Sequence, residues 1–150
     1  MNIKYELTDE TKNFCGITLH RIRALRDIPS AGVKSGDLGG WIEKESNLSK
    51  YDNAWVYGDA KVCDNAEVCG NAEVMDLHSY AIYKNSWSSG RWFTYTHSNK
   101  KWAVGCFYGT GEELIKKAYA DSELSGKCYE AIVRTQEAID KAIEEAKEAK

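Results

Sequence analysis

The sequence predicts a mainly β protein built on a short β-solenoid of the left-handed type, with N-terminal strands before it and a capping β-hairpin and C-terminal α-helices after it. Three observations predict this class: a six-residue repeat in the middle of the chain, alternating strand patterns on both sides of it, and a helix-capping signal before the last forty residues. The length of 150 residues and the 43% apolar content suit a single domain, 1–150.

Residues 1–36 are expected to form N-terminal strands. Residues 1–7 and 16–25 have strand-like composition, and the second segment alternates apolar and polar residues, so Arg21 and Arg23 are expected to share its polar face. Pro29 and the glycines that follow it mark turns on the way to the repeat.

Residues 37–76 contain the six-residue repeat. A valine recurs every six residues, and so does an alanine, which stands two places before each valine; the two columns are Val56, Val62, Val68, Val74 and Ala54, Ala60, Ala66, Ala72. Gly, Asn and Asp between them are residues that tolerate the backbone of a tight corner. Three repeats, about 18 residues, make one coil, which predicts that Val56 stacks on Val74.

The repeat extends backwards less regularly. We place Ile42 and Leu48 in the alanine column and Leu38 in the valine column, although Lys44 and Lys50 occupy valine positions. Residues 37–76 then give about two coils, and repeat proteins generally need about three units with caps. The rest of the chain, or another subunit, is therefore expected to cover the ends.

Residues 77–111 are predicted to be an aromatic and basic hairpin that caps the coil, with strands at 91–97 and 101–107 and a turn at 98–99. Residues 112–150 are predicted to be helical. Thr110 and Glu113 form a capping box for a helix through Tyr119, and a second helix is expected from about Gly126 to the end.

The second predicted helix has an apolar stripe at 3-4 spacing, and this stripe is expected to pack on the domain or on a helix of another subunit. Its members are Tyr129, Ile132, Gln136, Ile139, Ile143 and Ala146. Glu137 and Lys141 are expected to pair on the helix surface. The short coil and this stripe predict a homo-oligomer, with a trimer favoured over a dimer.

Composition excludes several classes of function. The chain has no run of about 20 apolar residues and no apolar segment after its first residues, which argues against a membrane span and a signal peptide. Five cysteines without a CxxC pair suggest reduced thiols in the cytoplasm, so no metal site is expected. No cofactor is expected either.

Several segments of the sequence resemble a family of small hexapeptide-repeat proteins encoded by phages and prophages. The resemblance lies in the segments 21–25, 32–45, 47–49 and 53–58 with the repeats that follow, and in the segment 105–114. It implies a phage origin, a bacterial host cytoplasm as the location, and a β-solenoid. The family often has no assigned activity, so the resemblance implies no catalytic residue.

The candidate site lies in the third block of the chain. Residues 77–111 carry four cations and no acid, whereas residues 37–76 carry nine acids and three lysines. Phosphates need positive donors and bases need aromatic faces, so the candidate ligand is a small anionic nucleotide. The residues expected to bind it are Arg91, Trp92, Tyr95, Lys100, Lys101 and Trp102, with help from Arg21 and Arg23. The alternative interpretation is purely structural: the aromatic residues close the open end of the coil, and the cations are solvated.

The favoured function is a non-enzymatic phage accessory protein that sequesters a nucleotide immune signal and so counters bacterial defence. A competing enzyme function is that of a hexapeptide-repeat acyltransferase, which would use His20, His78 or His97 as a general base. Two further roles stay open: a virion component, and a protein-binding inhibitor or DNA mimic that would bind a host protein through its acidic face. The acidic residues of that face are Asp52, Asp59, Asp64, Glu67, Glu73 and Asp76.

Overall fold

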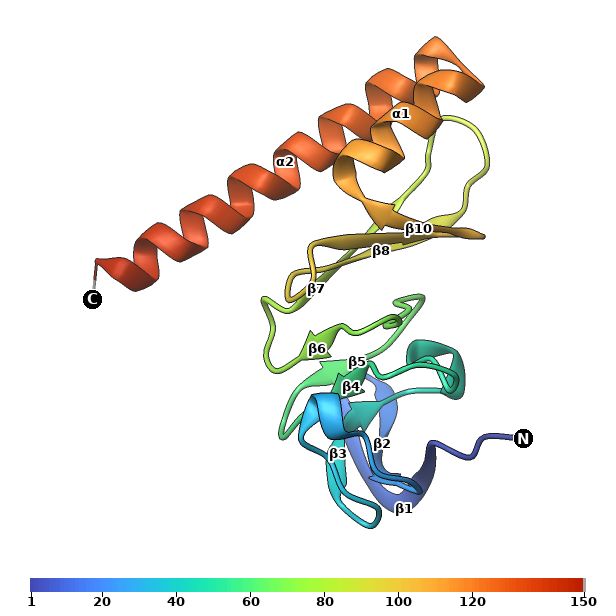
Figure 1. Ribbon diagram of the computed structural model, residues 1–150, viewed down its shortest axis with the longest axis vertical. Coiled ribbons are helices and arrows are strands. Elements are labelled where there is room, and N and C mark those ends of the chain that lie inside the picture. The colour runs from blue at the N-terminus through green and yellow to red at the C-terminus, as the bar shows by residue number, and fades with distance from the viewer. Residues whose placement is uncertain (150) are drawn as a thin grey trace.

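In the computed structural model, which describes residues 1–149, the chain folds into a lower and an upper part (Figure 1). The lower part holds the N-terminal strands and the coiled segment around one apolar core that includes Ile22, Val56 and Val74. The upper part holds an antiparallel sheet and both helices around an aromatic core that includes Phe93 and Trp102.

The lower part contains two small sheets. β1 (Tyr5–Phe14) and β2 (Ile17–Ala24) form an antiparallel hairpin, β3 (Leu38–Ile42) pairs antiparallel with β2, and β5 (Lys61–Val62) pairs parallel with β3. β4 (Trp55–Val56) and β6 (Glu73–Val74) form a separate parallel pair. The first sheet is thus mixed, with the order β1-β2-β3-β5.

The upper part is one antiparallel sheet covered by two helices (Figure 1). Its strands, in the order β10-β9-β8-β7, are β7 (Tyr80–Lys84), β8 (Trp92–Thr96), β9 (Lys101–Val104) and β10 (Phe107–Thr110). The helices are α1 (Gly111–Asp121) and the long α2 (Glu123–Glu148), whose C-terminal half projects past the sheet (Figure 1).

The predicted fold class, mainly β with a β-solenoid over residues 37–76, is wrong. The described residues form three small sheets, one mixed, one antiparallel and one parallel, together with two helices. The parallel strands β4, β5 and β6 are only two residues long. The first parallel strand, β3, pairs on its other side with an antiparallel hairpin instead of a further coil.

The register of the coiled segment is partly as predicted. Val56 pairs in parallel with Val74, 18 residues later, as expected. Ile42 instead pairs with Val62, and Leu48 with Val68, so both belong to the valine column and their predicted place in the alanine column is wrong. Leu48 and Val56 lie eight residues apart instead of six, because the corner between them is two residues longer than the repeat.

Two glycines in β3 allow the lower core to close. An ideal Cβ on Gly39 would lie 2.7 Å from a ring carbon of Trp55, and one on Gly40 would lie 2.6 Å from a methyl group of Val56. No side chain fits at these distances. The glycines are therefore required by the close approach of the next part of the coil. Leu38, expected to point inward, is exposed at the start of the same strand.

Hydroxyl groups of the upper part accept hydrogen bonds from the backbone at the end of the coiled segment. We call residues 67–75 the coil edge. Glu67 N–H donates to Thr94 Oγ1 at 2.9 Å, and Glu73 N–H donates to Ser98 Oγ at 2.7 Å. Met75 N–H donates to Ser79 Oγ at 2.9 Å. The β8–β9 hairpin exists as predicted, but it meets the coil through polar groups, while its aromatic side chains pack toward the helices.

Both helices form, with different limits from those predicted. Thr110 and Glu113 make the predicted capping box, and α1 continues two residues beyond Tyr119. Ser122 caps α2, which begins before Gly126. The residues of the predicted apolar stripe differ in burial: Tyr129 and Gln136 are buried, whereas Ile139 is exposed. Lys150, the last residue of the predicted helix, lies outside the described residues.

Candidate functional site

A cavity of about 360 Å³ lies between α2, the first turn of α1 and the β8–β9 hairpin. We call it the α2 hollow. Its walls come from three segments that are distant in sequence: Tyr95, Lys100 and Trp102 in the hairpin, residues 110–112 at the start of α1, and Val133 and Lys141 in α2. The volume falls in the range of small-ligand pockets, roughly 300–1,000 Å³.

Trp102 supplies an unused hydrogen-bond donor at this wall. The residue is 2% exposed, and among residues 1–149 its Nε1–H makes no hydrogen bond. Nε1 stands 3.4 Å from the position of an ideal Cβ on Gly111, itself a lining residue. The buried side-chain atoms without a partner in the described residues are Trp41 Nε1 and His97 Nδ1 and do not include Trp102 Nε1, so this N–H is accessible at the hollow and can donate to an acceptor there.

The first turn of α1 adds backbone donors. A helix begins with N–H groups that have no partner within the helix, and its N-terminus favours negative charge. The capping box uses the N–H of Glu113, which donates to Thr110 Oγ1. The N–H groups of Gly111 and Glu112 belong to the same turn, at the wall of the hollow. N–H groups at the start of a helix can bind an anion in this way.

Four carboxylates also line the α2 hollow, and each has a partner. Arg134 donates to Glu112 at 2.6 Å and to Glu137 at 2.9 Å. Those contacts lower the pKa of Glu112, and they raise the pKa of Arg134.

The other two carboxylates are those of Asp140 and Glu144. Asp140 accepts hydrogen bonds from Tyr95 and Gln136, and Glu144 faces Lys100 at 3.8 Å. Burial, followed by the Asp140 contact, raises the pKa of Tyr95, so this hydroxyl stays a donor.

Lys141 is the cation of the hollow that has no carboxylate partner among the described residues. The predicted Glu137–Lys141 pair does not form, because Glu137 turns to Arg134, three residues before it. Lys141, the Trp102 N–H and the first turn of α1 therefore remain available to a ligand. All three are positive or hydrogen-bond donors, which favours an anionic group.

Three of the eight predicted site residues, Tyr95, Lys100 and Trp102, meet at the α2 hollow. Both rings are buried in the aromatic core, where Tyr95 and Trp102 lie 4.8 Å apart between centroids. Because both rings are packed in this core, neither is free on both faces as expected for base stacking. Alternation along β8 and β9 could have predicted this, since every second residue of a covered sheet faces its core.

The remaining predicted residues of the hairpin lie elsewhere. Arg91 packs over Gly105, beyond the opposite end of β8 from Lys100. Trp92 is partly exposed and lies beneath the ammonium of Lys84. Lys101 lines a different hollow, of about 420 Å³, between the hairpin turn and the coil. These three residues do not form a common site with Trp102.

Arg21 and Arg23 lie in the lower part, on β2. The Arg21 guanidinium stacks over Trp41, and its Nε–H donates to the Gly39 carbonyl at 3.1 Å. Arg23 pairs with Glu6 at 2.8 Å. Both arginines are thus engaged in the N-terminal sheet and are not part of the α2 hollow.

The sequence reasoning missed Gly111, Val133 and Lys141. The capping box at Thr110 was a usable signal, because it marks the start of a helix and hence a set of unpaired N–H groups. Lys141 carried no such signal, since its availability depends on the contact between Glu137 and Arg134.

The three histidines proposed for an acyltransferase are dispersed. His20 Nδ1 lies 3.4 Å from the Thr8 carbonyl in the N-terminal hairpin, and His78 is exposed in the loop before β7. His97 faces Asp140 at 3.3 Å and Glu144 at 3.7 Å. His97 thus joins the hairpin turn to α2.

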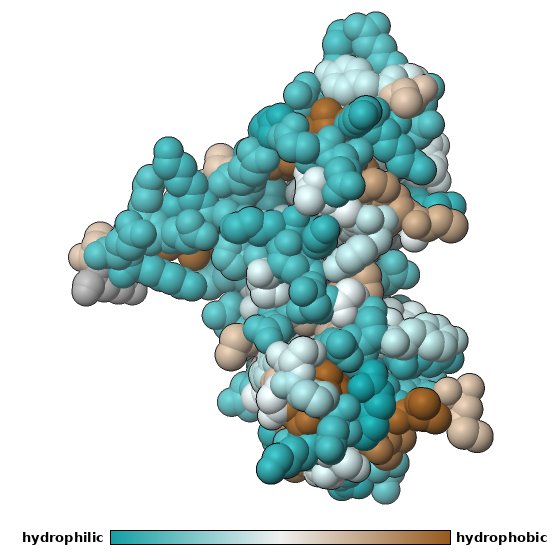
Figure 2. All heavy atoms as spheres, viewed as in Figure 1, coloured by the Kyte–Doolittle hydropathy of each residue, from teal (hydrophilic) through white to brown (hydrophobic). Residues whose placement is uncertain are grey.

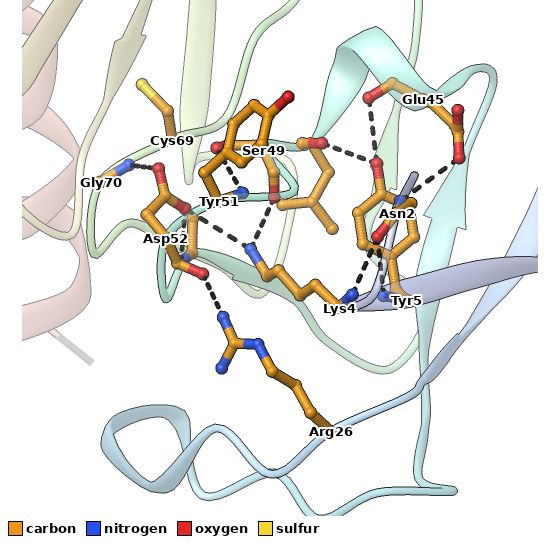
Figure 3. Close-up of polar contacts among 12 residues, drawn as sticks. Asn2, Lys4, Tyr5, Arg26, Glu45, Ser49, Tyr51, Asp52, Cys69 and Gly70 are labelled. Atoms are coloured by element: carbon orange, nitrogen blue, oxygen red, sulfur yellow. Dashed lines mark hydrogen bonds and ion pairs between the residues drawn. The ribbon is translucent and has the colours of Figure 1, made fainter.

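A buried lysine holds the longer corner of the coil (Figure 3). Lys4 is fully buried, and its ammonium donates to the Ser49 carbonyl at 2.7 Å and faces Asp52 at 3.4 Å. Asp52 also accepts from Gly70 N–H at 2.6 Å. Burial lowers the pKa of Lys4 to about 8, against a smaller opposing effect of Asp52. Asp52, counted among the acidic residues of a DNA mimic, therefore has a structural contact.

Two kinds of feature are absent from residues 1–149. No cluster of three or more His, Cys, Asp or Glu side chains in this range is placed to hold a metal ion. No helix of the described chain is both long and apolar enough to cross a membrane.

No protein-family model matches the chain, and no curated protein matches it.

Proposed function

We propose that this chain is a non-catalytic binding protein that holds a small anionic nucleotide in the α2 hollow. The single observation that supports the proposal most is the unpartnered indole N–H of Trp102 beside the first turn of α1. Lys141 provides a positive charge at the same wall. A phosphate group is a strong acceptor for all three kinds of donor.

The remaining wall suits the nucleoside part of the ligand. Val133 and the rings of Tyr95 and Trp102 give the cavity apolar surface. A volume of about 360 Å³ is enough for one nucleotide unit, so a larger ligand would extend into solvent. The proposed contact with the base is therefore apolar burial instead of stacking on an open ring.

The proposed role is sequestration of this nucleotide in the cytoplasm of a phage-infected bacterium. The phage setting follows from the resemblance of the repeat segment, and the binding mode follows from the hollow. Sequestration needs tight binding without turnover. A direct check is to purify the protein from infected or expressing cells, denature it, and analyse the released small molecules by mass spectrometry.

Calorimetry tests the site itself. Mononucleotides, cyclic nucleotides, dinucleotides and ADP-ribose are titrated beside the corresponding nucleosides. We expect a phosphate-bearing ligand to bind more tightly than its nucleoside. Trp102→Phe removes the N–H and should weaken binding by about tenfold or more, since a hydrogen bond to a charged group contributes roughly 1.5–3 kcal/mol.

Two control variants complete the experiment. Trp55→Phe changes a buried tryptophan in the lower core, which is not near the hollow, and should leave binding unchanged. Arg91→Glu tests the site predicted from sequence and should also have no effect, because Arg91 lies over Gly105. If no ligand of the set binds more tightly than about 10 μM, roughly −7 kcal/mol, the proposal is wrong.

A further inference from the structure

The charges that line the α2 hollow are unevenly paired. α2 is mainly hydrophilic on the face turned toward the viewer in Figure 2, and both carboxylates and lysines line the hollow. The carboxylates belong to Glu112, Glu137, Asp140 and Glu144, and the lysines are Lys100 and Lys141. The charge that a ligand must carry depends on which of these groups already have a partner of opposite charge.

Three of these carboxylates lie beside a cation that they occupy. Arg134 donates to Glu112 at 2.6 Å and to Glu137 at 2.9 Å. The single charge of Arg134 is therefore divided between two glutamates. Lys100 faces Glu144 at 3.8 Å. Neither Arg134 nor Lys100 is thus free to balance the charge of a ligand.

Asp140 adds a negative charge whose hydrogen-bond donors are neutral. The residue is buried, and its donors are the Tyr95 hydroxyl and the Gln136 amide. His97 lies 3.3 Å from this carboxylate and is charged only when it is protonated. Like charges repel more strongly where water is displaced. Asp140 therefore disfavours a second negative charge on a ligand in the hollow.

Lys141 is the one lysine of the described lining that has no carboxylate partner, so it offers a single free positive charge. The other available donors are the Trp102 indole N–H and the backbone N–H groups of Gly111 and Glu112. These groups are neutral, and a helix N-terminus adds only about half a positive charge. One negative charge of a ligand thus has a counter-ion in the hollow, and a second charge has none.

We infer that the α2 hollow selects a phosphodiester, with one negative charge, over a phosphomonoester or a polyphosphate. The inference rests on the proposed function and adds the class of ligand. A phosphodiester carries one negative charge near neutral pH, whereas a monoester carries about 1.5 to 2, because its second pKa is about 6. Cyclic nucleotides and nucleotides joined through one phosphate belong to the selected class.

Calorimetry at pH 8 with a series of increasing charge tests the inference. The probes are adenosine, the methyl ester of AMP, AMP and ADP, which share one nucleoside and gain negative charge in that order. The methyl ester should bind most tightly, at least about threefold more tightly than AMP, since one charge contact near a protein surface has an effect of this size. The corresponding uridine series makes the result independent of the base.

Glu144→Gln provides the matched change in the protein. It removes one negative charge and releases Lys100, so the preference for the methyl ester over AMP should disappear. Glu145→Gln is the control, because Glu145 is exposed and is not part of the lining of the hollow. It removes the same charge from α2 and should keep the preference. Circular dichroism checks that both variants retain their helices.

Two results would overturn the inference and leave the proposed function intact. One is AMP or ADP binding as tightly as the methyl ester, or more tightly, at pH 8. The other is an equal effect of Glu144→Gln and Glu145→Gln on the preference, because it would reflect the charge of α2 as a whole. Absence of binding by every probe of both series would also overturn the inference, whereas the proposed function is wrong only if the wider set of nucleotides fails to bind.

Discussion

The hydroxyl group of Tyr95 donates a hydrogen bond to the carboxylate of Asp140, so β8 and α2 meet through a polar contact inside the upper part. Both side chains are buried. The contact holds α2 where it forms one wall of the α2 hollow. The position of that wall therefore depends on a bond between groups 45 residues apart.

Tyr95→Phe should destabilise the protein by about 1–3 kcal/mol, because it leaves a buried carboxylate without one of its donors. Urea unfolding followed by circular dichroism measures the change. Tyr51→Phe is the control, since Tyr51 is largely exposed and should change stability very little. Equal effects of the two substitutions would contradict the role assigned to the Asp140 contact.

Lys4 should make stability rise as the pH increases from about 8 to about 9. Its pKa in the folded protein is about 8, below its ordinary value of 10.5, because of burial. The unfolded chain therefore binds more protons than the folded one in this interval. That difference makes unfolding less favourable as pH rises, by up to about 1.4 kcal/mol per pH unit.

The pH range in which stability rises must end near pH 9. Burial raises the pKa of Cys63 and Cys69 to about 11 from 9.0, which makes stability fall at higher pH. Urea unfolding at successive pH values should show the rise for the unsubstituted protein and not for Lys4→Met. Lys50→Met, a change at a partly exposed lysine, should retain it. A rise of the same size in Lys4→Met would exclude Lys4 as its source.

Gly40→Ala should destabilise the lower part by about 1–3 kcal/mol, since the new methyl group would overpack the core. It would lie 2.6 Å from a methyl group of Val56 and 2.7 Å from the Ala60 carbonyl oxygen. The melting temperature gives the readout, with Ser46→Ala as an exposed control. An unchanged melting temperature in Gly40→Ala would mean that the coil can move aside at no cost.

Val68→Asp should abolish soluble folding, because it places a charge without a partner in the lower core. Its neighbour Glu67 has an exposed side chain, so Glu67→Gln should express and fold normally. Soluble yield and circular dichroism distinguish the two. Equal tolerance would show that Val68 does not face the core in solution.

Local patterns predicted the elements that depend on neighbouring residues. The capping box at Thr110 set the start of α1, and the alternation around residues 91–107 identified the β8–β9 hairpin. The pairing of Val56 with Val74 also followed from the repeat. In these cases the pattern repeats within a few residues, or at a fixed interval, so the sequence alone carries the information.

The solenoid and the site required information that the repeat does not contain. The corner between Leu48 and Val56 has two additional residues, which shifted the predicted column of Ile42 and Leu48. Its conformation depends on Asp52 and Lys4, from separate parts of the chain. Likewise, the α2 hollow joins a hairpin, a helix start and a second helix, and only packing brings Trp102 beside Gly111.

The hydroxyl groups that bind the coil edge also affect how the protein behaves at high concentration. A free strand edge exposes N–H and C=O groups on which a strand of another molecule can add, and this leads to aggregation. Here Thr94, Ser98 and Ser79 occupy the N–H groups of Glu67, Glu73 and Met75. The upper part therefore protects the coil against growth of fibril-like stacks, and loss of these small hydroxyl side chains would expose a template for self-assembly.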